Sequence, residues 1–91
     1  MTDSQPLALR LKKSARKDLA NLQPKFFKQI MTKILLLLEE PRPQDCKPLK
    51  GYAGAYRVDQ GEYRILYTID STTIEVFRIG KRNDDEVYEN L

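Results

Sequence analysis

The C-terminal third of the chain carries three segments in which apolar and polar residues alternate, and this pattern constrains the fold most. The segments span residues 53–59, 62–70 and 73–79, with tight turns at Gln60-Gly61 and Ser71-Thr72. Alternation with a period of two is typical of strands, because successive side chains point to opposite faces of a sheet. Two-residue loops join antiparallel neighbours, so the segments predict a three-strand antiparallel meander.

The N-terminal half predicts one strand and two helices. Residues 7–12 alternate leucines with other residues and read as a strand. Ser14 is expected to be the N-cap of a helix over residues 15–22. Pro24 suits the first turn of a second helix, and apolar residues at helical spacing extend that helix to about residue 39. The predicted fold is α+β: an N-terminal strand, a helical hairpin, then the meander, forming one sheet packed on the helices.

The length and the rare residue types narrow the possible classes of protein. The chain has 91 residues, so we expect a single domain over residues 1–91. The chain has one cysteine, Cys46, and no histidine. An internal disulfide and the usual zinc ligands are therefore excluded, so we expect no metal and no cofactor. The longest apolar run, residues 34–38, is far shorter than the roughly 20 residues of a membrane span. We therefore expect a cytoplasmic protein that does not contact membranes.

The charge is unevenly distributed along the chain. Residues 1–82 carry 16 basic and 9 acidic groups, whereas residues 83–91 carry 4 acidic groups and no basic one. A basic body favours polyanions or acidic partners, although the net charge of +3 is too small to decide between them.

Two arginines of the meander are candidate phosphate ligands. A turn at Gln60-Gly61 sets Arg57 opposite Arg64 and Asp59 opposite Glu62. Like charges that face each other across a sheet are unfavourable, so the arginine pair predicts that a phosphate binds between them. The alternative is that both guanidinium groups point into solvent and splay apart.

Further cations lie at the two ends of the meander. Gly80-Lys81-Arg82 ends the third strand, where the glycine allows the backbone to turn or to approach a ligand closely. Lys47 and Lys50 precede the first strand of the meander, and lysine suits contact with phosphate. We expect Lys47, Lys50 and Lys81 to bind RNA, with ordinary surface lysines as the alternative.

Exposed apolar and aromatic side chains offer other contacts. Tyr88 follows Arg82 in the acidic tip and can either stack on an unpaired RNA base or pack back on the sheet and anchor the tail. Leu35 and Leu36 lie off the apolar stripe of the second helix and are candidates for a partner surface.

With these motifs the chain resembles the RelE toxins of the RelE/ParE superfamily over nearly its full length. The resemblance is carried by residues 48–51, Tyr56-Arg57-Val58, residues 61–67, and Gly80-Lys81-Arg82 followed by Glu86-Val87-Tyr88. The last spacing is specific to the RelE branch and is largely lacking in the gyrase-poisoning ParE branch.

The resemblance implies the toxin of a type II toxin–antitoxin pair. Such a toxin is a ribosome-dependent mRNA interferase, a metal-independent endoribonuclease that cuts mRNA in the A site by attack of a 2′-OH on the phosphodiester and so inhibits translation. The implied partners are a cognate antitoxin protein, the ribosome and mRNA. The implied assembly is a heteromeric toxin–antitoxin complex that binds operator DNA through the antitoxin.

The resemblance also assigns roles to residues of this sequence. Arg57 falls on a catalytic lysine or arginine, and Arg64 on the strand arginine that holds the scissile phosphate. Arg82 falls on the arginine proposed to act at the leaving oxygen, and Tyr88 on the tyrosine that orients the mRNA base. Lys50 corresponds to a basic residue that contacts RNA.

Asp59 departs from the family pattern, because the best-known member has a lysine there. It is either a turn residue or the general base. Arginine is a poor base, since its pKa exceeds about 12, so deprotonation of the 2′-OH needs Asp59, a ribosomal group or water. Two other functions remain open: a ParE-like toxin that inhibits DNA gyrase without nuclease activity, and a non-catalytic RNA-binding module.

Overall fold

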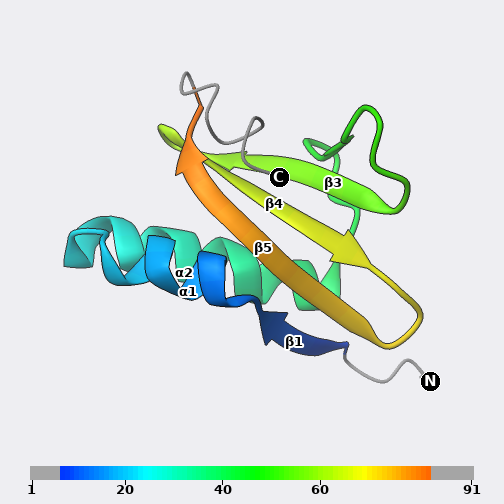
Figure 1. The fold of residues 1–91 in the computed structure, drawn as a ribbon, viewed down its shortest axis with the longest axis horizontal. Helices are drawn as coiled ribbons and strands as arrows, with labels where there is room; N and C mark the ends of the chain where they lie inside the picture. Colours follow the sequence, from blue (N-terminus) through cyan, green and yellow to red (C-terminus); the bar gives the residue numbers. More distant parts are fainter. Residues whose placement is uncertain (1–6, 83–91) are drawn as a thin grey trace.

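The structure, a computed structural model, describes residues 7–82. Within them the element order is β1 (Ala8–Leu11), α1 (Lys13–Ala20), α2 (Pro24–Glu39), β2 (Lys47–Pro48), β3 (Ala55–Gln60), β4 (Tyr63–Ile69) and β5 (Thr73–Lys81). These strands form one five-stranded sheet in the order β1-β5-β4-β3-β2. β1 pairs with β5 in parallel, and the other neighbours are antiparallel. The α+β arrangement is confirmed, with β2 as an additional short strand (Figure 1).

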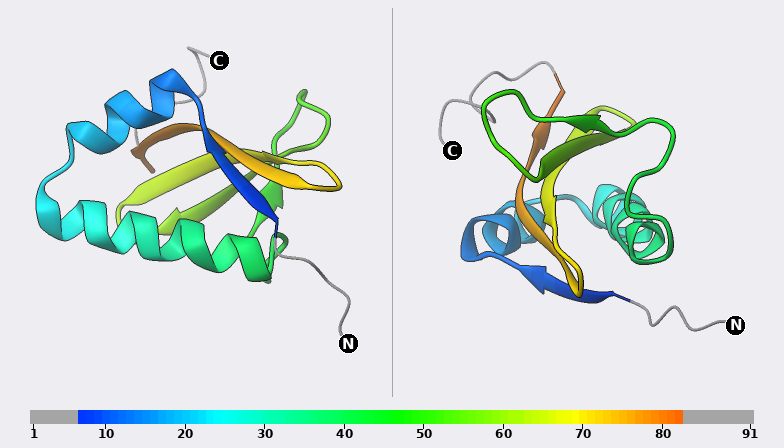
Figure 2. Two further views of the ribbon diagram at one scale, coloured as in Figure 1. Left: turned by 90° about the horizontal axis from the view of Figure 1, so that it is seen from below. Right: turned by 90° about the vertical axis from the view of Figure 1, so that its right-hand side faces the viewer.

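The two helices are joined at one end and run along one side of the twisted sheet (Figures 1 and 2). α2 begins at Pro24 as predicted, because proline lacks the N–H that the first turn of a helix leaves unpaired. The predicted cap of α1 is wrong. The helix begins at Lys13, after an N-cap at Lys12, and Ser14 lies in its first turn. The Ser14 Oγ instead donates a hydrogen bond to the Phe77 carbonyl oxygen of β5, at 2.6 Å.

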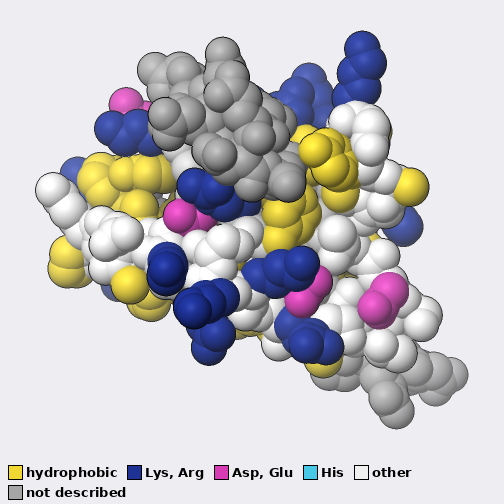
Figure 3. Space-filling view, viewed as in Figure 1, with side chains coloured by type: hydrophobic (Ala, Val, Ile, Leu, Met, Phe, Trp, Pro, Cys, Tyr) yellow, Lys and Arg dark blue, Asp and Glu magenta, His cyan; other side chains and the backbone are white. Residues whose placement is uncertain are grey.

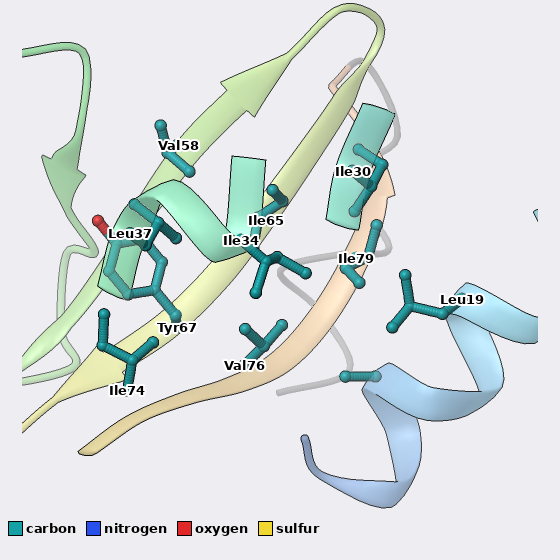
Figure 4. Packing of buried hydrophobic residues seen from close by; sticks show 11 residues of the cluster. Leu19, Ile30, Ile34, Leu37, Val58, Ile65, Tyr67, Ile74, Val76 and Ile79 are labelled. Carbon is teal, nitrogen blue, oxygen red and sulfur yellow. The ribbon is translucent and has the colours of Figure 1, made fainter. Parts of the chain in front are cut away.

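The main core lies between the helices and one face of the sheet (Figure 4). α2 contributes Ile30, Ile34 and Leu37, and α1 contributes Ala15 and Leu19. The sheet contributes buried side chains from its three long strands: Val58, Ile65, Tyr67, Ile74, Val76 and Ile79. Burial of a large aliphatic or aromatic side chain stabilises a fold by about 1.5–3 kcal/mol, so this cluster is the main reason that the helices stay on the sheet.

β5 carries one extra residue relative to β4. The pairing with β4 shifts between Val76 and Arg78, which leaves Phe77 without a partner in a β-bulge. The bulge interrupts the alternation of side chains, so that Ile79 faces the main core as Val76 does. Phe77 packs instead on the opposite face of the sheet, and its carbonyl oxygen accepts the hydrogen bond from Ser14.

The second face of the sheet, which we call the open face, has a smaller apolar cluster of its own. Leu49, Ala55 and Leu66 are buried there, and Phe77 packs against them. This cluster lies between an arginine-rich region near the β3–β4 turn and a hollow near the start of α1, both described below. Within residues 7–82, no helix has the length and the apolar character that crossing a membrane requires.

Candidate active site

The β3–β4 turn decides which charged side chains face one another. Gln60 pairs with Tyr63, so the two loop residues are Gly61 and Glu62. Gly61 has a φ of 60°, which fits the first loop position of a type II′ turn. The turn therefore lies one residue later than the sequence analysis predicted.

The expected pairing of the two arginines is wrong for the same reason. Asp59 pairs with Arg64, and Arg57 pairs with Leu66. The pairing has shifted by two residues along one strand, which preserves the faces, so Arg57, Asp59 and Arg64 still share the open face. Arg57 and Arg64 are diagonal neighbours, and Cα atoms in that relation are about 7–8 Å apart.

The Asp59 carboxylate bridges two arginines. Its Oδ1 lies 2.8 Å from the Arg64 Nε, and its Oδ2 lies 3.3 Å from the Arg82 Nε. The Arg64 side chain is 14% exposed and the Arg82 side chain 54% exposed, so the first pair is the better shielded from water. Arg82 is also fixed through its backbone N–H, which donates to the Glu62 carbonyl oxygen at 2.8 Å.

The pKa of Asp59 lies below its ordinary value. Partial burial acts to raise this pKa, but the hydrogen bond and charge of Arg64, followed by the charges of Arg82 and Arg57, outweigh burial. Asp59 is therefore anionic at neutral pH. A lowered pKa makes a carboxylate a weaker proton acceptor, so the general-base role stays a prediction that this environment does not favour.

Arg57 is the arginine of this cluster whose positive charge is least neutralised by a carboxylate. It is half-exposed, and no ion pair joins it to another residue in the 7–82 range. Its neighbour on β2 is Lys47, which therefore lies on the open face as well. Among residues 7–82, three guanidinium groups surround one carboxylate and leave an excess of positive charge. This suits a phosphate, because guanidinium donates paired hydrogen bonds to its oxygens.

Of the remaining predicted site residues, Lys81 does not face this cluster. Lys81 pairs with Tyr63 while Gly80 pairs with Arg64, so alternation puts Lys81 on the face opposite the arginines. Lys50 is exposed in the turn after β2. Tyr88 lies outside the described residues. On the side of the molecule seen in Figure 3, Lys and Arg side chains are widespread, and Asp and Glu are few.

Sequence reasoning missed a hollow on the open face, of about 530 Å³. It is bounded by the start of α1, the loop before β3 and the bulge of β5. Val76 and Phe77, two apolar residues in succession within an alternating strand, are the signal that could have revealed the bulge. Within residues 7–82, no group of three or more His, Cys, Asp or Glu side chains is arranged to hold a metal ion.

Comparison with known proteins identifies the family. The family described as the ParE toxin of the type II toxin–antitoxin system parDE matches residues 9–86. Toxin RelG of Mycobacterium tuberculosis is 32% identical over 82 residues, which cover 87% of this chain and 94% of RelG.

Solved structures agree in fold. The toxin–antitoxin complex RelBE2 of M. tuberculosis contains a chain that is 34% identical, with a TM-score of 0.75 and coverage of 87% of this chain and 94% of that one. A double-arginine mutant of E. coli toxin RelE in the free state is 25% identical, with a TM-score of 0.79 and 93% coverage of both chains. The fold is thus RelE-like, and the chain belongs to the ParE/RelE family of toxins of type II toxin–antitoxin systems.

Proposed function

We propose that this toxin is a ribosome-dependent mRNA interferase that cuts mRNA in the A site. The observation that carries the proposal is the grouping of Arg57, Arg64 and Arg82 on the sheet face away from the helices, around the Asp59 carboxylate. Such a surface has donors for a phosphodiester and an excess of positive charge to hold it.

In the proposed reaction, the ribose 2′-OH attacks the adjacent phosphorus and the bond to the 5′ oxygen breaks. The 5′ oxygen leaves with the bonding electron pair and takes a proton from water, so the products are a 2′,3′-cyclic phosphate and a 5′-OH end. Arg57 and Arg64 stabilise the charge that develops on the phosphate oxygens, and Arg82 acts at the leaving oxygen. Loss of one donor of this kind typically lowers the rate by about 10²–10³.

The 2′-OH must lose a proton, and the arginines cannot accept it. The proton passes to water, to a ribosomal group or to Asp59. The protein itself thus supplies an incomplete set of general acids and bases. This explains a need for the ribosome, because the ribosome aligns the 2′-OH with the phosphorus, and such alignment supplies much of the rate. Lys47 and Lys50 add positive charge along the path of the RNA.

We further propose that a cognate antitoxin binds this toxin. Related toxins have been crystallised as RelBE complexes, from M. tuberculosis and from E. coli. An acidic partner is favoured by the basic body of the chain, residues 1–82.

Mapping of mRNA 5′ ends after brief induction of the toxin tests the nuclease proposal. We expect new 5′-OH ends inside reading frames, at fixed positions within codons. Arg64→Ala should abolish them, whereas Arg16→Ala, which removes an exposed arginine of α1, should leave them unchanged. Equal cleavage by wild type and Arg64→Ala would remove the arginine cluster from the mechanism.

A second function, inhibition of DNA gyrase without cleavage of RNA, is favoured by the match to the parDE toxin family. It predicts a DNA-damage response with intact mRNA. Under this alternative, growth arrest survives Arg64→Ala, so the same induction experiment separates the two functions.

A further inference from the structure

The hollow on the open face combines aromatic and basic side chains. The residues that matter for its chemistry are Lys12, Ser14, Tyr52, Thr68, Phe77 and Arg78. Tyr52 is 48% exposed, and Phe77 is half-buried in the small apolar cluster. Of the described residues that line the hollow, none is acidic. Aromatic rings beside cations are the combination that binds unpaired nucleotides, because the rings stack on the base while the cations attract the phosphate.

The fold fixes one of these cations in place. The Arg78 Nε donates to the Asp18 Oδ2 at 3.0 Å, and the same oxygen accepts the Ile79 backbone N–H at 2.9 Å. Asp18 thus ties the guanidinium to α1 through a single nitrogen, which leaves the Nη groups as donors for a ligand. A side chain held in this way loses little conformational entropy on binding.

The hollow lies beside the arginine cluster along β3, with the small apolar cluster between them. Ala55 and Thr68 pair across β3 and β4, and both line the hollow. Arg57 lies two residues beyond Ala55 on the same strand and face, about 7 Å away at the usual rise of a strand. One extended nucleotide can bridge that distance, so a strand with a phosphate at Arg57 reaches the hollow with its next residue.

We propose that this hollow is a nucleotide subsite of the toxin. It takes the base of an RNA nucleotide that adjoins the cleaved bond, stacked on Tyr52, with the phosphate of that nucleotide at Lys12 and Arg78. The subsite rests on the proposed RNA cleavage and adds to it a second binding contact with the substrate, outside the arginine cluster.

The test uses ribosomes that carry mRNA in which one ribose at a time lacks its base, at each position beside the cleaved bond. At one position, loss of the base should slow cleavage by wild type about tenfold, the usual effect of one lost stacking contact. Tyr52→Ala should slow cleavage of intact mRNA by a similar factor. For this variant, loss of the base should not slow cleavage further. Phe27→Ala, which removes an exposed ring of α2 that does not line the hollow, should cleave as wild type does.

A pair of lysine variants tests the phosphate contact. Lys12 lines the hollow, whereas its neighbour Lys13 is exposed outside it. With single-stranded RNA that carries 2′-deoxyribose at the cleaved position, Lys12→Gln should reduce the slope of log affinity against log salt by about 1. Lys13→Gln should leave this slope unchanged.

Three results would overturn the subsite. Tyr52→Ala could cleave as fast as wild type, with no position sensitive to a missing base. Tyr52→Ala could also weaken antitoxin binding while cleavage stays normal, which would make the hollow a protein-docking site. Finally, wild type could fail to cleave mRNA at all. That result would overturn the proposed function together with the subsite, and wild type alone is enough to show it.

Discussion

The Asp59 carboxylate sets the charge of the candidate site, because it is the only acidic group within residues 7–82 that pairs with Arg64 and Arg82 there. A carboxylate between guanidinium groups resembles the phosphate they are proposed to hold. In the free toxin it keeps the two side chains in position, and it lowers the repulsion between them.

The lowered pKa of Asp59 makes a prediction about stability and pH. A carboxyl group whose pKa is lower in the folded state stabilises the fold above its unfolded pKa, near 3.9, and this stabilisation is lost as the pH falls through the folded value. Asp59→Asn should therefore lower the urea midpoint at pH 7, and the difference from wild type should shrink below about pH 4. A difference that is independent of pH would contradict this origin.

The buried hydroxyl of Tyr67 makes a second prediction. Tyr67 is 0% exposed, and its hydroxyl donates to the Pro41 carbonyl oxygen at 2.8 Å. Tyr67→Phe removes that hydrogen bond and should lower the free energy of unfolding by about 1 kcal/mol. For a domain of this size the melting temperature should fall by about 4–8 °C. Tyr52→Phe, on an exposed ring, is the matched control and should leave the melting temperature unchanged.

Among the elements, the β3–β4 hairpin depends on one glycine. Gly61 has a φ of 60°, and a Cβ there would meet nothing closer than the Gln29 Oε1 at 3.9 Å. Gly61→Ala should therefore destabilise the fold through the backbone alone, by about 1–2 kcal/mol in urea denaturation. Glu62→Ala, at the neighbouring loop position, should stay within about 0.5 kcal/mol of wild type. Equal losses for the two variants would mean that the turn tolerates a side chain at Gly61.

The link between α1 and β5 depends on Asp18. Its carboxylate accepts hydrogen bonds from the Arg78 side chain and from the Ile79 backbone, directly after the bulge. Asp18→Ala should cost about 1.5–3 kcal/mol in urea denaturation, the range for hydrogen bonds to a charged group. Asp18→Asn keeps an accepting oxygen and should recover part of the loss. An Asn variant as unstable as the Ala variant would assign the effect to charge alone.

The helices and the long strands were predictable because each follows a period of 3.6 or 2 residues, although the bulge interrupts the period in β5. The turn was placed one residue early because glycine permits a positive φ at either loop position. The same error paired Arg57 with Arg64, although it kept the correct faces. The site could thus be predicted as a set of residues on one face, but the Asp59 bridge could not.

The parallel pairing of β1 with β5 joins segments that are far apart in the sequence, and β2 has only two residues, so local patterns do not determine either feature. The hollow at Tyr52 and Phe77 lies between the start of α1, the loop before β3 and the bulge of β5, and for that reason no single motif predicted it. The cap prediction failed similarly, because the Ser14 hydroxyl bonds to β5 rather than to its own helix.

For the whole molecule, an antitoxin that binds only the folded toxin should raise the melting temperature in a concentration-dependent way. At a free antitoxin concentration of about 100 times the Kd, the added stability is about 2.7 kcal/mol. The Arg64→Ala toxin is suited to this titration, because we expect it to be harmless to the host that produces it. A melting temperature independent of antitoxin concentration would mean that the antitoxin does not bind the folded toxin in preference to the unfolded chain.

The parallel pairing of β1 with β5 has a consequence for the time at which the toxin becomes dangerous. β1 is the first strand to leave the ribosome, yet its only neighbour in the described sheet is the last strand, where Ala8 pairs with Thr73. A contact between such distant parts of a chain forms late and slowly. The nascent chain therefore stays inactive until β5 has emerged, and the cell has the whole period of synthesis in which to supply the antitoxin.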